Sequence, residues 1–184
     1  MNKKIFLLYI PMLLVPYVAL FRLATIFLSE DIEFFNFIMY SVFDANALYL
    51  TGALVLYCFL SAVLSVICFF ISILNKYDAL SIARISVIIK IMQIPAYLII
   101  FALSVLFTIA IFTIPFVIGL FLIDYFTLLF SGLLVGASVI NSIRQGIFKP
   151  NDVIWVIILQ SVFCVDVVFS IIFYIKLKRA TINN

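Results

Sequence analysis

Long apolar stretches dominate the chain, and short polar segments separate them. A helix needs about 20 predominantly apolar residues to cross the hydrocarbon core of a bilayer, and it satisfies its backbone hydrogen bonds internally. Several stretches meet this requirement, so the sequence predicts an all-α fold, a polytopic transmembrane helical bundle of about five spans. The predicted spans cover residues 5–28, 47–74, 95–114, 118–140 and 153–175.

A shorter segment, residues 79–93, precedes the third predicted span and has a different pattern. Its large apolar residues recur at the spacing of one helical face: Ile82, Ile85, Ile89 and Met92. Arg84 and Lys90 lie away from that face. A helix with one apolar and one basic face is typical of the membrane interface. The pattern therefore predicts a surface amphipathic helix that ends where Pro95 begins the next span.

The positions of the basic residues predict how the chain is oriented. Cytoplasmic loops of membrane proteins are enriched in lysine and arginine. With the N-terminus in the cytoplasm, the inner side of a five-span bundle carries these basic residues: Lys3, Lys4, Lys76, Arg84, Lys90, Arg144 and Lys149. The first and third turns, on the outer side, carry none. This asymmetry predicts a multi-pass protein of the cell membrane with a cytoplasmic N-terminus.

The C-terminal tail opposes this arrangement. Five crossings put the C-terminus outside, yet Lys176, Lys178 and Arg179 lie there. Either the tail is an exception to the rule, or residues 153–175 fold back without crossing. Four spans plus a re-entrant segment are therefore the alternative to five spans.

The composition makes a bilayer the natural solvent for this chain. Hydrophobic residues make up 68% of the 184 residues and charged residues 10%, against about 45–50% and about 25% in soluble domains. The length fits a single transmembrane helical domain, residues 1–184. The net charge of +3 is small and scattered, which does not fit nucleic-acid binding.

Residue types that carry enzyme chemistry are scarce. The chain has no histidine, which is the commonest metal ligand and general base. Its three cysteines, Cys58, Cys68 and Cys164, lie inside apolar runs and form no CxxC motif, as expected of small buried residues. We therefore expect no catalytic residue, no metal site and no cofactor.

Three charged residues within the predicted spans need a physical reason, because a charged side chain at the bilayer centre costs about 3 kcal/mol. Arg22, Asp124 and Asp166 fall at similar depths in the outer half of the membrane. One guanidinium can bridge two carboxylates, so we expect an intramembrane charge cluster, with Gln160 as a polar neighbour. The alternatives are separate snorkelling to the interface and an ion, proton or substrate site.

Small and weakly polar residues mark two further helix faces. The second span repeats them along one seam: Thr51, Cys58, Ser61, Ser65, Cys68 and Ser72. The fourth span contains Gly132 and Gly136 in a GxxxG arrangement. Small residues let membrane helices approach closely, so both seams predict helix packing, either within the chain or in a homo-oligomer. A water-facing pore lining is the alternative for the serine-containing seam.

Three segments carry a resemblance to a known group of proteins. They are ARISVIIKIMQIPAY at residues 83–97, FLIDYFT at residues 121–127 and QSVFCVD at residues 160–166. These segments resemble small multi-pass membrane proteins of low-GC Gram-positive bacteria, a group with no assigned activity. The resemblance implies membrane residence and supplies no catalytic residue.

Together these features predict a non-enzymatic membrane protein with an interaction, regulatory or immunity-type role. Its expected partners are the lipid bilayer and either a second copy of the chain or another membrane protein. The charge cluster and the serine-containing seam support a second hypothesis, a small channel or transporter.

Overall fold

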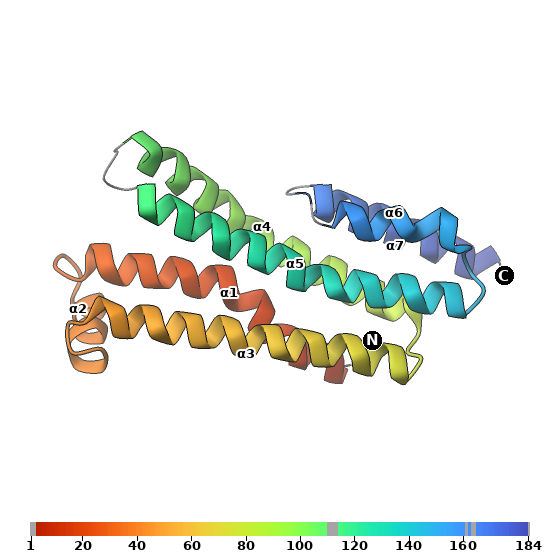
Figure 1. Ribbon diagram of the computed structural model, residues 1–184, viewed down its shortest axis with the longest axis horizontal. Coiled ribbons are helices and arrows are strands. Elements are labelled where there is room, and N and C mark those ends of the chain that lie inside the picture. Colours follow the sequence, from red (N-terminus) through yellow and green to blue (C-terminus); the bar gives the residue numbers. More distant parts are fainter. Residues whose placement is uncertain (1–2, 110–113, 161, 163–164, 184) are drawn as a thin grey trace.

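The protein is an all-α bundle, as predicted (Figure 1). The computed structural model describes residues 3–109, 114–160, 162 and 165–183, and within these ranges no residue forms a β-strand. In chain order the helical elements are α1 (Lys3–Leu28), α2 (Glu33–Phe37), the π-helical turn η1 (Ile38–Val42), α3 (Ala47–Leu74), α4 (Ala79–Ile109), α5 (Ile114–Arg144), α6 (Pro150–Leu159) and α7 (Val165–Asn183).

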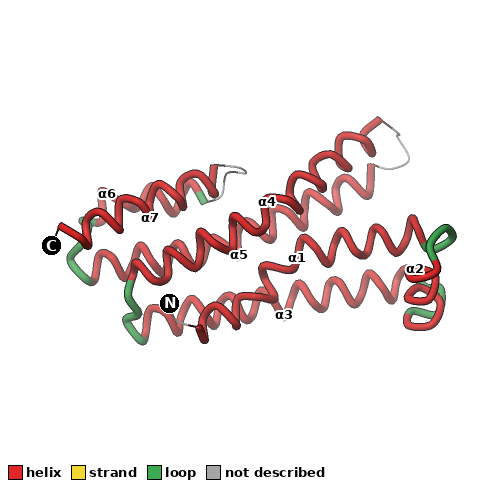
Figure 2. The backbone as a smooth tube through the Cα atoms, turned by 180° about the vertical axis from the view of Figure 1, so that it is seen from behind, coloured by secondary structure: helices red, strands yellow, loops and turns green. Residues whose placement is uncertain are grey.

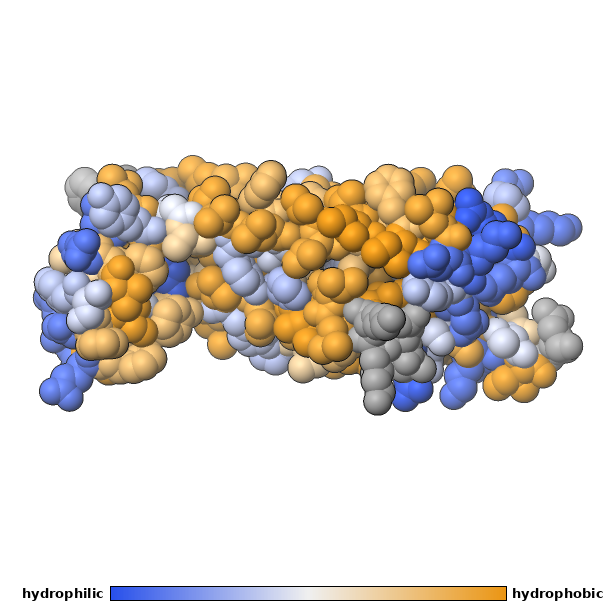
Figure 3. Space-filling model, turned by 90° about the horizontal axis from the view of Figure 1, so that it is seen from below, coloured by the Kyte–Doolittle hydropathy of each residue, from blue (hydrophilic) through white to orange (hydrophobic). Residues whose placement is uncertain are grey.

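Four of these helices are long and apolar enough to cross a membrane, namely α1, α3, α4 and α5. The shortest of these apolar segments has 24 residues and is therefore about 36 Å long at 1.5 Å per residue, against about 30 Å for the hydrocarbon core. Apolar side chains cover the middle of the molecule and polar side chains gather at its two ends (Figure 3). The chain is therefore built as a membrane-embedded bundle.

The long helices form two antiparallel hairpins, α1 with α3 and α4 with α5 (Figure 1). A core that includes Tyr9, Met12, Cys68, Ile85 and Leu134 joins the two hairpins near the end where α1 begins. Toward the α2 end, α4 and α5 lean away from α1 and α3 (Figure 2). The bundle is therefore tightly packed at one end and more open at the other.

The predicted surface helix at residues 79–93 is the first half of α4, and its predicted place on the membrane surface is wrong. Helix α4 continues through Pro95 into the third predicted span without a break. Ile82, Ile85 and Ile89 lie in the core instead of facing lipid, and Lys90 is only 1% exposed. Three of the four residues of the predicted apolar face are therefore buried in the bundle, whereas Met92 is exposed.

The fifth apolar run, residues 153–175, is not one continuous span. Helix α6 ends at Leu159 and α7 begins at Val165, and the two lie side by side over about half of the bundle (Figure 1). Lys176 of α7 lies 5.4 Å from the ring of Trp155 of α6, so the chain turns back on itself. A ten-residue helix covers about 15 Å, half the hydrocarbon core. The structure therefore agrees with four long helices plus a returning segment.

Candidate functional site

A buried ion pair joins α4 to the α6–α7 hairpin. The Lys90 ammonium lies 2.6 Å from the Asp166 carboxylate and donates a second hydrogen bond, also 2.6 Å, to Oε1 of Gln160. The Ser170 hydroxyl donates to the same Gln160 oxygen at 3.2 Å. All four side chains are buried. We call these four residues, Lys90, Gln160, Asp166 and Ser170, the buried polar cluster.

The local fold explains why the carboxylate is placed there. Asp166 lies in the first turn of α7, where the unpaired backbone N–H groups and the helix dipole favour a negative charge. Gln160 caps the C-terminus of α6. The turn between the two short helices therefore brings two oxygen acceptors to one cation. The contact can fix the hairpin against α4, and nothing in its geometry leaves a reactive atom exposed.

The predicted triad of Arg22, Asp124 and Asp166 does not form. Arg22 donates to the Thr51 hydroxyl instead, at 3.2 Å from Nε and 2.7 Å from a terminal nitrogen, and Asp166 pairs with Lys90. Asp124 is 8% exposed, and its Oδ1 has no hydrogen-bond partner among the described residues. The prediction failed because the rotation of each helix, which spacing along the chain does not determine, points Arg22 toward α3.

The side chain of Gln93 replaces a backbone hydrogen bond that is missing at Pro16. Proline lacks an N–H, so Pro16 cannot bond the carbonyl four residues earlier, which is that of Met12. The side-chain amide of Gln93 donates to this carbonyl oxygen at 3.1 Å. Helix α1 bends in its middle (Figure 2), as helices do at prolines. A side chain from α4 thus satisfies the backbone of α1 at its bend.

The seam predicted along α3 divides between two environments. Ser61, Ser65, Cys68 and Ser72 are buried within the bundle, in agreement with packing inside the chain. Thr51 and Cys58 instead line a lateral groove. The seam is therefore not a continuous water-facing stripe along α3.

The two glycines of the GxxxG arrangement have different surroundings. A Cβ atom added at Gly132 would lie 3.2 Å from Cβ of Gln160, whereas one added at Gly136 would meet only a ring atom of Phe69 at 3.7 Å. Gly132 therefore permits the close approach of Gln160, a member of the buried polar cluster, to α5. This supports the predicted packing role for Gly132 inside the chain.

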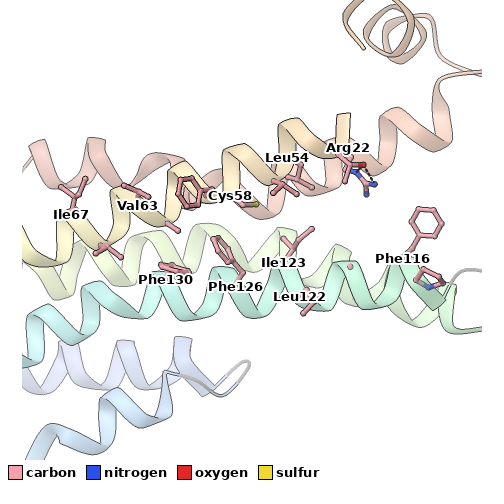
Figure 4. A pocket seen from close by; sticks show the side chains of 17 residues that line it. Arg22, Leu54, Cys58, Val63, Ile67, Phe116, Leu122, Ile123, Phe126 and Phe130 are labelled. Atoms are coloured by element: carbon pink, nitrogen blue, oxygen red, sulfur yellow. Dashed lines mark hydrogen bonds between the residues drawn. The ribbon is translucent and has the colours of Figure 1, made fainter. Parts of the chain in front are cut away.

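A lateral groove lies between α3 and α5 in the open half of the bundle (Figure 4). Its volume is about 950 Å³, at the upper end of the range for small-molecule pockets. Its walls are almost entirely apolar, with Leu54 and Val63 on one side and Phe126 and Phe130 on the other. Arg22 is the charged residue of the lining and lies at one end. We call this feature the lateral groove.

Metal binding finds no support in the part of the chain that the structure describes. Within it, no group of three or more histidine, cysteine, aspartate or glutamate side chains lies close enough to hold an ion. Cys58 and Cys68 are both free thiols. Cys164 lies outside the described residues.

Lys90 and Ser170 are the functional candidates that sequence reasoning missed. Lys90 was assigned to a cytoplasmic surface helix because its segment is amphipathic. A signal was present, because Ser86, Lys90, Gln93 and Tyr97 recur at spacings of four, three and four residues, which places them on one helical face. All four are buried, so a polar stripe marks the interior face of α4.

In comparisons with known proteins, no family model, curated protein or solved structure matches the chain.

Proposed function

We propose that the chain is a non-enzymatic membrane protein that works by binding a partner within the bilayer, and that the lateral groove is its binding surface. The groove is the observation that carries the proposal. It is large and apolar, and it opens toward the surrounding lipid, because rim residues such as Phe59 and Leu122 are more than half exposed. The buried charges support this assignment, since Lys90 and Asp166 are used in packing the hairpin.

We also propose that the protein lies in the cell membrane with both termini in the cytoplasm. Four crossings return the chain to its starting side, and the α6–α7 hairpin keeps the C-terminus there. Arg84 and Lys178 line the same surface hollow, so the basic C-terminal tail lies near other basic residues. The acidic α1–α2 loop, with Glu30 and Asp31, lies at the opposite end. This arrangement removes the conflict with the positive-inside rule.

Photo-crosslinking tests whether the lateral groove binds a partner. A benzophenone amino acid is placed at Val55, which lines the groove, or at Leu56, its neighbour outside it. The two positions are similarly exposed, 63% and 58%, and differ little in depth. After irradiation in native membranes, intact-protein mass spectrometry should find one dominant adduct at position 55 and a heterogeneous mixture at position 56. The same mixture at both positions would exclude the groove as a binding surface.

The second candidate function, a small channel or transporter, rests on Asp124. A buried carboxylate with an unpartnered oxygen is a recognised feature of intramembrane ion and proton sites. Under the binding proposal, liposomes that contain the purified chain should pass protons and alkali cations no faster than protein-free liposomes. A flux that Asp124→Asn abolishes would instead support transport.

A further inference from the structure

The lateral groove has a cation at one end and apolar walls along the rest of its length. The Arg22 guanidinium has five N–H donors, and its hydrogen bonds within the described residues all go to one oxygen, that of Thr51. No carboxylate lines the groove, and Arg22 takes part in no ion pair among the described side chains. The guanidinium therefore keeps donors for an anionic group on a ligand.

Arg22 and Thr51 lie close to the lipid headgroups when α3 is centred in the membrane. Helix α3 has 28 residues and is about 42 Å long, so it extends about 6 Å beyond the hydrocarbon core at each end when centred in the membrane. Thr51 is four residues, about 6 Å, from the start of α3. The guanidinium that it binds is therefore placed at the boundary between hydrocarbon and headgroups.

The groove is long enough to hold an acyl chain. From Thr51 to Ile67 the groove follows α3 for about 24 Å, which exceeds the roughly 15 Å half-thickness of the hydrocarbon core.

We infer that the lateral groove binds one anionic phospholipid, with its phosphate on Arg22 and an acyl chain along Leu54, Cys58 and Ile67. This inference rests on the proposed function, because it names the partner that the groove holds. A guanidinium matches a phosphate with two parallel hydrogen bonds. The pairing also compensates a charge that would otherwise face apolar surroundings without a counter-ion.

Native mass spectrometry of the full chain in a neutral detergent tests this inference with phosphatidylglycerol and phosphatidylcholine as probes. The unaltered protein should retain one phosphatidylglycerol at a concentration about tenfold below that needed for phosphatidylcholine, because the choline cation of phosphatidylcholine would lie near the Arg22 guanidinium and repel it. Arg22→Gln, which can still bond Thr51, should remove this preference, and Arg22→Lys should keep part of it. Arg84→Gln removes an equal charge outside the groove and should leave the preference unchanged.

A second pair of variants keeps the test independent of Arg22. Val55→Trp fills the groove and should weaken binding of both lipids, whereas Leu56→Trp, outside the groove, should not.

Equal affinity for the two lipids in the unaltered protein, or a dimer in place of the lipid complex, would overturn the inference. A protein adduct from the crosslink at position 55 would overturn it and leave the proposed function standing. The absence of a dominant adduct there would remove both.

Discussion

Lys90 is held by two oxygen atoms of the α6–α7 hairpin, each at 2.6 Å from its ammonium group. Bringing the two charges of Lys90 and Asp166 out of water is costly, and their mutual attraction offsets that cost only while both are present. Removing one partner leaves an uncompensated buried charge, whereas removing both leaves an apolar contact. The pair therefore fixes the position of the hairpin more than it adds stability.

This reasoning predicts a specific pattern in a double-mutant cycle. Lys90→Met and Asp166→Leu should each lower the free energy of unfolding by about 3–5 kcal/mol, seen as a lower Tm in detergent and less monodisperse protein. The double variant should recover most of this loss, because neither charge is then unpaired. The matched control is Lys149→Met, which removes an exposed lysine and should change little. Additive losses in the double variant would show that the two residues do not interact.

At the level of helices, a proline that would weaken an isolated α1 is accommodated by the neighbouring helix α4. Membrane helices tolerate proline where another helix satisfies the freed backbone group. The Gln93 amide does this for the Met12 carbonyl. The Tyr17 hydroxyl of α1 in turn donates to the Met92 carbonyl of α4. Reciprocal hydrogen bonds therefore join α1 and α4 next to Pro16.

The coupling predicts that the cost of losing Gln93 depends on Pro16. Gln93→Leu alone should lower the free energy of unfolding by about 1–3 kcal/mol, the cost of a buried unsatisfied carbonyl. In a Pro16→Ala background the same change should cost much less, because an alanine at position 16 has an N–H that can bond the Met12 carbonyl. Thermal unfolding in detergent measures both steps. An equal loss in both backgrounds would contradict the role assigned to Gln93.

Hydropathy predicts the long helices because a membrane helix needs a long apolar run, and each of α1, α3, α4 and α5 has one. Periodicity does not tell whether an apolar face meets lipid headgroups or another helix, which is why residues 79–93 were assigned to the surface. A single spanning helix and two shorter helices that turn back can have equally high hydropathy. The hydropathy of the sequence therefore does not reveal the break between Leu159 and Val165.

The pairing of the buried charges is the part that sequence could not supply. Arg22, Asp124 and Asp166 were grouped by depth alone, and depth is only one of the two coordinates of a residue on a helix. The other coordinate, rotation about the helix axis, is set by packing against neighbours. It directs Arg22 to Thr51 and Lys90 to Asp166. A polar stripe on α4 carried the missing information, but the assignment of Lys90 to a surface helix concealed it.

For the molecule as a whole, the α6–α7 hairpin decides on which side of the membrane the chain ends. Helix α6 starts at the same end as the C-terminus of α5, and α7 returns to that end (Figure 1). Lys149 and Lys178 are both exposed there, whereas Glu30 is exposed at the opposite end. Five full crossings would instead place Lys178 on the side of Glu30. The two topologies therefore differ in a single observable, the side of residue 178.

Labelling of single cysteines with a membrane-impermeant thiol reagent separates these topologies. In a background without Cys58, Cys68 and Cys164, we expect Glu30→Cys to react in intact cells. Lys149→Cys and Lys178→Cys should react only after permeabilisation, because the hairpin returns the chain to the cytoplasmic side. Reaction of positions 30 and 178 together would mean that the last segment crosses the membrane. Reaction of positions 149 and 178 in intact cells, with position 30 protected, would keep the hairpin and reverse the orientation, against the positive-inside rule.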